Sequence, residues 1–175
     1  MARMKKLEFA ADTDQRVVGV DPGKTTAMVL VRGRRVESVR FVATDGPLLA
    51  MCAAIADALA ELSPERVVCE IQLQRGGRMP AIEAVVSAIC HERGIPLVRH
   101  CPRAFHRGLG YPGGHRANKR HSVALARRVL GTAAFDALLE WAPTSRVHDL
   151  CEAFLFAFNV ARPRGIAARA DGHGA

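Results

Sequence analysis

The segment RVVGVDPG, residues 16–23, constrains the fold more than any other part of the chain. Its β-branched residues are typical of a buried strand, and Asp-Pro-Gly is a turn signal that ends this strand at Asp21. The segment is not a phosphate-binding loop, because only three residues separate Gly19 from Gly23 and Val18 stands where the first glycine of that motif belongs. A buried carboxylate is costly unless it has a partner, so Asp21 requires a structural or functional explanation.

Strand and helix signals follow this segment in the order three strands, helix, strand, helix, strand and then helices. A hairpin is predicted around RGRR, with its turn at Gly33. The last helix is expected to begin after a capping residue, Ser145, and to end before Pro163. This order predicts an α/β fold, a mixed sheet with a helical C-terminal third. The predicted strands span residues 16–21, 27–31, 36–42, 66–73 and 95–100, and the predicted helices span 47–62, 80–93, 117–130, 132–141 and 145–162.

The 175 residues are enough for one domain. We expect a flexible leader over residues 1–15, a globular domain over 16–162 and a disordered basic tail over 163–175. No apolar run is long enough to cross a membrane, and the first residues lack the apolar segment of a secretion signal. The five cysteines form no CxxC pair, which favours reduced, mostly buried thiols. We therefore expect an intracellular protein in a reducing compartment without a membrane partner; the pattern does not distinguish cytoplasm, nucleus, mitochondrion and viral factory.

A net charge of +8 favours a polyanionic partner, usually a nucleic acid. No acid occurs between Arg93 and Phe135, and cationic side chains there would give salt-sensitive affinity for phosphates. Phe105 and Tyr111 are candidates for stacking on unpaired bases. The alternative is a solvated basic helix face with Phe105 in the core. The basic residues of this stretch are Arg93, Arg99, Arg103, Arg107, Arg116, Lys119, Arg120, Arg127 and Arg128.

Three further acids stand among apolar residues as Asp21 does. Glu70 interrupts the buried strand VVCEIQ, and Asp149 and Glu152 have the i,i+3 spacing that places both on one face of the last helix. Four carboxylates from distant segments can converge on divalent cations such as Mg²⁺, which prefer oxygen ligands. Each acid also has a simpler explanation. Asp21 can cap the Pro-Gly turn, and Glu70 can pair with an arginine. Asp149 can interact with the helix dipole, with Glu152 in solvent.

Two short His/Cys pairs suggest a different metal, zinc. His100–Cys101 and the HDLC sequence at 148–151 contain side chains that zinc uses as ligands. Neither has a second pair at the spacing of a zinc finger. A hard cation with oxygen ligands is therefore the preferred interpretation.

Four sequence elements occur in an order that is known from one enzyme family. GVDPG is similar to that family's first-strand motif, CEIQ to its fourth-strand glutamate and HDLCEAF to its final-helix motif. A basic helix with a lysine, ANKRHSVALARRVL, precedes the last motif in the same order. On these elements the chain resembles Holliday junction resolvases of the RuvC type, within the ribonuclease H-like superfamily. The resemblance covers roughly residues 16–162 and is greatest to the poxvirus, phage and mitochondrial branch.

The resemblance implies a ribonuclease H-like mixed sheet of five strands flanked by helices. It also implies a divalent-metal-dependent endonuclease that nicks opposed strands of four-way DNA junctions and leaves 5′-phosphates. The cofactor would be Mg²⁺, two ions per site, with Mn²⁺ as a substitute. A homodimer is implied, because symmetric cutting needs two sites related by a two-fold axis. The implied catalytic residues are the metal ligands Asp21, Glu70, Asp149 and Glu152, together with Lys119 at the scissile phosphate.

We expect two groups of residues to contact DNA. One group follows Glu70 in the sequence. The other lies in and just before HRGLGYPGGHRANKR, residues 106–120, where glycine and proline predict a mobile surface loop. The expected contacts are Gln72, Gln74, Arg75, Arg78, Arg103, Arg107, Tyr111, Arg116 and Arg120.

Two positions depart from the bacterial pattern. Glu152 stands where many bacterial members carry aspartate, and Leu73 stands where they carry an aromatic residue that acts against the junction's bases. Two rival functions stay open. One is a related nuclease that acts on an RNA–DNA hybrid or a transposon end, and the other is a junction-binding or DNA-binding module that does not cut. The intact set of four acids disfavours the second.

Overall fold

The computed structural model of the protein describes residues 14–72 and 77–160. The predicted tail, and all but the end of the predicted leader, lie outside these residues, so their disorder stays a prediction. Within the described residues, no helix combines the length and the apolar character that crossing a membrane requires.

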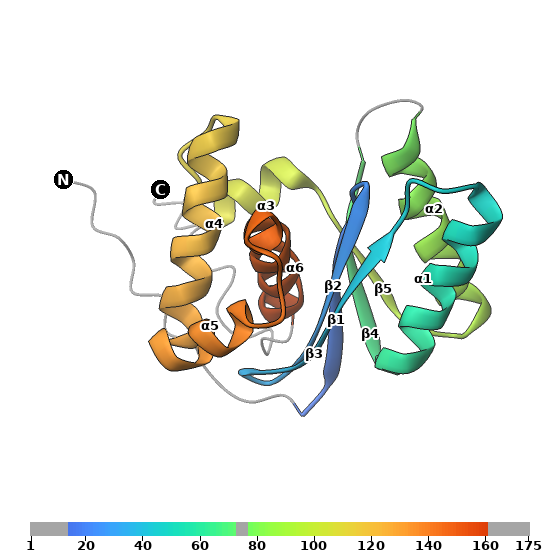
Figure 1. Ribbon diagram of the computed structural model, residues 1–175, viewed down its shortest axis with the longest axis horizontal. Helices are drawn as coiled ribbons and strands as arrows, with labels where there is room; N and C mark the ends of the chain where they lie inside the picture. Colours follow the sequence, from blue (N-terminus) through green and yellow to red (C-terminus); the bar gives the residue numbers. More distant parts are fainter. Residues whose placement is uncertain (1–13, 73–76, 161–175) are drawn as a thin grey trace, which may run out of the picture.

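The centre of the molecule is a mixed five-stranded sheet made of β1 (Arg16–Asp21), β2 (Thr25–Arg32), β3 (Arg35–Ala43), β4 (Arg66–Glu70) and β5 (Leu97–His100). The strands are arranged in the order β3-β2-β1-β4-β5 (Figure 1). The first three strands are antiparallel neighbours, as the hairpin signal predicts, whereas β4 runs parallel to β1 and β5 runs parallel to β4. Strand β1 thus lies in the middle of the sheet, which explains its unbroken apolar run.

Helices cover both faces of the sheet (Figure 1). They are α1 (Leu48–Leu62), α2 (Arg78–Glu92), α3 (Pro102–Gly108), α4 (His115–Leu130), α5 (Thr132–Leu139) and α6 (Val147–Val160), with a 3-10 turn, η1 (Thr144–Arg146), before α6. Helices α1 and α2 lie on one face, α6 lies on the other, and α4 packs on the outer side of α6. The C-terminal third is helical, so the predicted fold class is confirmed.

The alternation of side chains along β1 and β4 decides which residues meet α6. Val20 of β1 and Cys69 of β4 belong to the core under α1 and α2. Because successive side chains of a strand point to opposite faces, the next residues, Asp21 and Glu70, point to the face that α6 covers. Val20 and Cys69 are also register partners, so Asp21 and Glu70 end neighbouring parallel strands at the same level.

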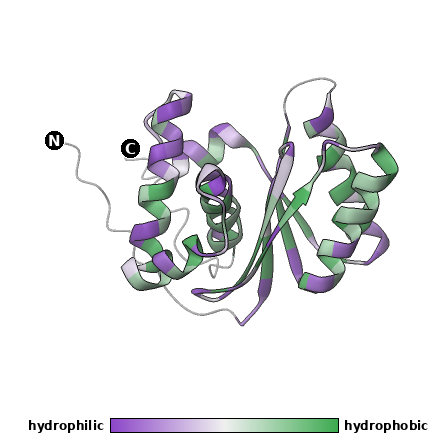
Figure 2. Cartoon of the chain, in the orientation of Figure 1, coloured by the Kyte–Doolittle hydropathy of each residue, from purple (hydrophilic) through white to green (hydrophobic). Residues whose placement is uncertain are grey.

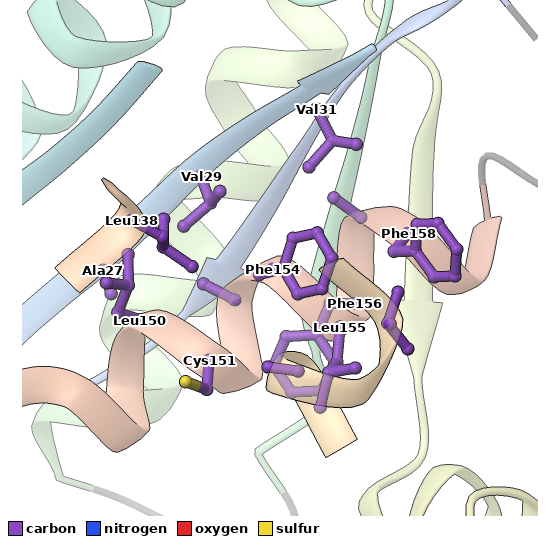
Figure 3. Close-up of a cluster of buried hydrophobic side chains, with 14 of the residues drawn as sticks. Ala27, Val29, Val31, Leu138, Leu150, Cys151, Phe154, Leu155, Phe156 and Phe158 are labelled. Atoms are coloured by element: carbon purple, nitrogen blue, oxygen red, sulfur yellow. The ribbon is translucent and has the colours of Figure 1, made fainter. Parts of the chain in front are cut away.

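The core under α6 is rich in aromatic and branched side chains (Figure 3). The rings of Phe154 and Phe158 stack with their centroids 5.6 Å apart, and Phe156 meets Phe105 of α3 edge to face at 4.7 Å. Phe105 is 5% exposed, which confirms the alternative that it is a core residue. Figure 2 shows hydrophobic residues along the central strands and α6, whereas the N-terminal half of α4 is hydrophilic.

Helix α6 rests directly on the main chain of β1 at Gly19. A Cβ atom at this position would lie 1.9 Å from the carbonyl oxygen of Ala153 and 2.8 Å from the amide nitrogen of Ala157. Both atoms belong to main chain, which cannot rotate aside as a flexible side chain can. The absence of a side chain at Gly19 therefore lets the two backbones touch, and this contact fixes the height of α6 above the strand that ends in Asp21.

The structure corrects three predictions of local structure. Ser145 does not cap α6: it lies inside η1, because the Arg146 amide already donates to the carbonyl of Pro143 and the turn continues into the helix. Helix α3 was absent from the predicted elements, although Pro102 in its first turn is the appropriate signal. Strand β4 ends at Glu70, before residue 73. The other predicted strands and helices are confirmed, with ends within two residues.

Gly19→Ala is expected to destabilise the protein, because the added methyl group overlaps with the main chain of α6. Overpacking of this kind costs about 1–3 kcal/mol or more, since relief requires movement of a whole helix. Denaturant titration measures the free energy of unfolding. Gly46→Ala is the control, because a Cβ there has no neighbour within 4 Å. Equal unfolding free energies for the two variants would contradict the importance of this contact.

Candidate functional site

Four carboxylates from three elements lie at one end of the sheet. Asp21 ends β1 and Glu70 ends β4, both on the α6 face. Asp149 and Glu152 lie three residues apart near the start of α6, between residues that are fully buried in the core. All four are partly buried. The register of two parallel strands and the docking of one helix therefore bring together acids that are far apart in the sequence.

The four acids interact electrostatically. Burial raises the pKa of Asp21 well above its ordinary value, and the charges of Glu152, Glu70 and Asp149 raise it further. Burial, with the charges of Glu70 and Asp149, raises the pKa of Glu152 to about 7. Burial raises the pKa of Glu70, while a hydrogen bond from Gln72 lowers it. Glu152 is partly buried and its pKa is raised, which disagrees with the explanation that it is a solvated helix residue.

The turn that follows Asp21 is held by hydroxyl groups. The Thr26 hydroxyl donates to the Gly23 carbonyl oxygen at 3.3 Å, and the Thr44 hydroxyl bonds the same oxygen. The Asp21 carboxylate has no hydrogen-bond or ion-pair partner among the described residues. The turn-capping explanation for Asp21 therefore finds no support, and this carboxylate is free to bind a ligand.

Asp149 differs from the other acids because its own segment supplies an imidazole and a guanidinium as partners. The Nε2 atom of His148 lies 2.6 Å from one carboxylate oxygen, and the Arg146 guanidinium donates to the other at 3.3 Å. These contacts hold the Asp149 side chain at the start of α6. They also compete with a metal ion for its oxygens. Neither Arg146 nor His148 was among the predicted site residues. Their positions in the sequence, three residues and one residue before Asp149, could have indicated these contacts.

The chemistry of the four side chains fits a hard divalent cation. Carboxylate oxygens are the ligands that Mg²⁺ prefers, and a bound cation would relieve the repulsion that raises these pKa values. In the side-chain positions of the structure, however, no three His, Cys, Asp or Glu residues of the described part are close enough to hold an ion together. Coordination therefore requires the acids, which already face one region, to turn toward a shared ion.

The zinc interpretation of HDLC is not supported. Cys151 is fully buried in the core under α6, and burial raises the pKa of its thiol to about 12. A thiol with so high a pKa stays protonated at neutral pH, whereas zinc binds the thiolate. His100 packs between the rings of Phe105 and Phe156, at 5.4 and 6.2 Å.

Lys119 of α4 faces the same region as the acids. Burial and the neighbouring acids raise the pKa of Asp21 and Glu152, and the charge of Lys119 partly offsets both shifts. Lys119 is partly buried, since α4 packs on α6. The buried Ser122 hydroxyl donates to the Lys119 carbonyl oxygen at 2.9 Å and stabilises this turn of α4. Lys119 and Arg146 are thus the cations that act on the four acids among the described residues.

Gln72 belongs to the predicted DNA-contact group that follows Glu70 in the sequence, and it bonds directly to one of the four acids. Its side-chain nitrogen donates to Glu70 Oε2 at 3.1 Å. Its main-chain N–H donates to Glu83 Oε2 at 2.8 Å, and Glu83 is a further residue that was not predicted. The predictions for Gln74, Arg75 and Leu73 lie outside the described residues.

Arg78, also predicted to contact DNA, is engaged in an internal contact. Its guanidinium donates to the carbonyl oxygen of Gly46 at 2.7 and 2.8 Å and to that of Thr44. These bonds join the start of α2 to the chain between β3 and α1. The structure thus gives Arg78 a structural role, and its contact with DNA stays a prediction.

The second predicted group lies on α3 and on the N-terminal half of α4. Arg103 and Arg107 belong to helix α3 and not to a loop, and Arg116 and Arg120 belong to α4. All four are exposed and have no ion-pair partner among the described residues. The four side chains are therefore available to phosphates.

Three other arginines of the acid-free stretch have partners elsewhere in the chain, whereas Arg128, near the end of α4, is exposed and has none among the described residues. Arg99 pairs with Glu83, and Arg127 lies 3.8 Å from Asp136. Arg93 donates to the carbonyl oxygen of Ala56 at 3.0 Å. The free positive charge is therefore concentrated on α3 and the first half of α4.

Tyr111, predicted to stack on a base, is engaged with side chains of its own chain. Its ring stacks on His106 with the centroids 4.3 Å apart and lies 4.7 Å from the ring of His121. Its hydroxyl oxygen is buried. Base stacking by Tyr111 stays a prediction, and it requires these contacts to be exchanged for contacts with DNA.

Comparison with solved structures shows which fold this is. RuvC of Thermus thermophilus in complex with a Holliday junction substrate is 20% identical, with a TM-score of 0.59, and the match covers 83% of this chain and 94% of that chain. A second T. thermophilus RuvC structure is 24% identical, with a TM-score of 0.57 and coverage of 83% and 95%. The yeast mitochondrial Holliday junction resolvase Ydc2 is 12% identical, with a TM-score of 0.60 and coverage of 85% and 80%.

These matches show that the chain has the ribonuclease H-like fold of RuvC-type resolvases, as its motifs predicted. No protein-family model and no curated relative matches the sequence. The bacterial and mitochondrial structures match with nearly equal TM-scores, so the branch stays a prediction.

Glu152→Gln is expected to change how stability depends on pH in the metal-free protein. An acid whose pKa is raised in the folded state costs stability once it ionises. This cost grows as pH rises from the unfolded-state pKa, about 4.3, to the folded-state pKa, about 7. The stability of the variant relative to wild type should therefore increase between those pH values and then level off.

Thermal unfolding in EDTA between pH 5 and pH 8 measures this difference. Glu140→Gln, at an exposed acid, is the control and should show a small difference that is independent of pH. A constant difference for Glu152→Gln as well would contradict the raised pKa.

Proposed function

We propose that the protein is a Holliday junction resolvase of the RuvC type, a metal-dependent endonuclease that nicks opposed strands of four-way DNA junctions. The observation that carries the proposal is that Asp21 and Glu70 end neighbouring parallel strands on the face covered by α6, the helix whose first turns carry Asp149 and Glu152. The fold it shares with RuvC, which was solved with a Holliday junction substrate, supports this choice of substrate.

The four carboxylates are the residues that would hold Mg²⁺ or Mn²⁺, two ions per site. When bound there, divalent ions would supply Lewis-acid activation of a water and charge stabilisation at the leaving 3′ oxygen, chemistry that would give 5′-phosphate and 3′-hydroxyl ends. Asp21 contributes an oxygen pair without internal partners, whereas one oxygen of Glu70 is already bonded to Gln72. Glu152, which is one methylene longer than aspartate, would ligate from the helix turn that also carries Asp149.

Lys119 would act on the phosphate. Its ammonium group lies near two of the acids, in a partly buried position where charge is poorly screened. A cation held at the scissile phosphate stabilises the negative charge that develops during hydrolysis. The effect of Lys119 therefore belongs mainly to the cleavage rate.

The exposed arginines of α3 and α4 would position the DNA. Arg103, Arg107, Arg116 and Arg120 lack ion-pair partners among the described residues, so their charges can neutralise phosphates of the junction arms. Such contacts do not depend on base sequence. Cutting two opposed strands further requires two sites related by a two-fold axis, so a homodimer is part of the proposal.

Incubation with a labelled four-way junction tests the proposal directly. Wild-type protein is expected to nick the junction only with Mg²⁺ or Mn²⁺. Asp21→Asn and Glu70→Gln are expected to abolish cutting and to leave junction binding intact or tighter, because each removes negative charge near phosphates. Asp57→Asn, on the exposed surface of α1 on the opposite side of the sheet, is the matched control and should cut normally.

The outcome also separates the rival functions. Salt-sensitive junction binding without cutting by wild type would support a non-cleaving module. Faster cutting of an RNA–DNA hybrid or a transposon end than of a junction would support a related nuclease. Near wild-type cutting by Asp21→Asn or Glu70→Gln would remove that residue from the metal site.

Lys119→Ala and Arg120→Ala are expected to separate catalysis from binding. Lys119→Ala should slow single-turnover cleavage by about a hundredfold or more and keep junction affinity within several-fold. Arg120→Ala should weaken binding more than cleavage, and it should reduce the slope of log affinity against log salt by about one. Single-turnover rates at saturating enzyme, with binding measured in Ca²⁺, give both quantities. Equal, modest losses in the two variants would refute a catalytic role for Lys119.

A further inference from the structure

Glu83 is a buried acid that lies outside the set of four carboxylates. It belongs to α2, on the opposite side of the sheet from α6, and is only 5% exposed (Figure 1). Its Oε1 atom accepts the Nε–H of Arg99 at 2.9 Å and also a terminal N–H of that guanidinium. Its Oε2 atom accepts the main-chain N–H of Gln72 at 2.8 Å. Both carboxylate oxygens of Glu83 are therefore used.

The bond to Gln72 occurs where the chain leaves the sheet. Strand β4 ends at Glu70, and the Ile71 amide donates to the carbonyl oxygen of His100 at 2.8 Å, next to the last register pair of β4 and β5. The next amide, that of Gln72, has no strand partner and bonds to Glu83 instead. This bond determines where the main chain lies two residues after Glu70.

Gln72 is thus held at two points. Its main chain is bonded to Glu83, and its side-chain nitrogen donates to Glu70 Oε2 at 3.1 Å. The bond from the Gln72 side chain to Glu70 reaches two residues back along the chain. It therefore depends on the position of the Gln72 peptide, which Glu83 holds. A hydrogen bond to an ionised carboxylate is stronger than a neutral one, which suits Glu83 to fix this peptide.

Arg99 explains how a buried carboxylate is tolerated at this position. Its guanidinium binds Glu83 with two N–H groups, and its own side chain is 53% exposed. Arg99 thereby balances the charge of Glu83, and no cation of the candidate site is needed for this. Helix α2, which carries Glu83, covers the face of the sheet opposite to α6, so Glu83 lies on the other side of the sheet from Asp149 and Glu152.

We infer that Glu83 is a positioning residue for Glu70. It holds the Gln72 peptide, Gln72 occupies one oxygen of Glu70, and the other oxygen is left to the shared region of the acids. Arg99 supplies the balancing charge. The inference rests on the proposed function for its catalytic consequence, whereas the contact from Glu83 to Gln72 and on to Glu70 is independent of that function.

The structural part is tested by NMR of the full-length protein, with the exchange rates of the Gln72 main-chain and side-chain amides as the readout. Glu83→Ala is expected to speed exchange of both amides about tenfold or more, because the side chain of Gln72 loses its place at Glu70. Glu83→Gln keeps one of the two acceptor oxygens; with that oxygen turned to the Gln72 N–H it should restore much of the protection, while the pairing with Arg99 is lost. Glu92→Ala, at an exposed acid of the same helix, is the control and should change neither amide.

The catalytic part is tested by single-turnover cleavage of the four-way junction. Glu83→Ala should cut about tenfold more slowly with affinity in Ca²⁺ almost unchanged, and Glu83→Gln should recover to within a few-fold of wild type. Gln72→Ala should show the same loss, and the double variant should be no slower than either single one. Gln72→Ala decides this part alone if Glu83→Ala does not fold.

Three results would overturn the inference. The first is unchanged exchange of the Gln72 amides in Glu83→Ala, and the second is faster exchange with a wild-type cleavage rate. The third is an equal loss in Glu83→Ala and Glu83→Gln, which would mean that Glu83 serves only folding. Absence of junction cutting by wild type would refute the proposed function instead, and the NMR result would still decide whether Glu83 positions Gln72.

Discussion

The contact between the main chains of β1 and α6 governs the geometry of this molecule. At Gly19 the two backbones meet with no side chain between them, because any Cβ would overlap with the Ala153 carbonyl. Glu152 directly precedes Ala153, and Asp21 follows Gly19 on the same face of the strand. The distance between the acids of the helix and those of the sheet is therefore set by main-chain contact. A site that handles charge requires such stiffness, since small displacements of its groups are costly in rate.

This arrangement costs the protein stability. Burial raises the pKa values of Asp21, Glu70 and Glu152, and the charges of neighbouring acids raise those of Asp21 and Glu152 further. Each acid is therefore less favourable in its ionised form in the folded state than in the unfolded chain. The surrounding core offsets this cost through the closely packed rings of α6. Positive charges reduce the repulsion between these acids. Lys119 lowers the pKa values of Asp21 and Glu152 in the metal-free protein, and a bound metal ion would lower them more. Electrostatic strain in the metal-free protein and affinity for cations thus have one physical origin.

The polar groups around the site divide into those that build it and those that stay free. Arg78, Arg99 and Arg127 are bonded within the protein, whereas the exposed arginines of α3 and α4 have no partner among the described residues. Glu83 belongs to the first class: from behind the sheet it fixes the peptide that follows β4. Arginines that are alike in the sequence therefore differ in role: some are bonded within the protein, and others are available to a ligand, depending on the residues that surround them in the fold.

The sequence by itself determined the order of the five strands, the hairpin at Gly33 and the choice of four acids as candidate ligands, but it did not reveal α3. Local patterns are sufficient for these, because turn residues act over a few positions and a carboxylate inside an apolar run is conspicuous wherever it occurs. Only the tertiary structure decided that the four acids share one region, that Phe105 belongs to the core, that Ser145 enters a turn rather than capping a helix, and that Glu83 bonds Gln72. These outcomes depend on strand register and on helix packing between residues far apart in the chain. No local pattern contains them, because the energy of each contact depends on the partner that the fold brings to it.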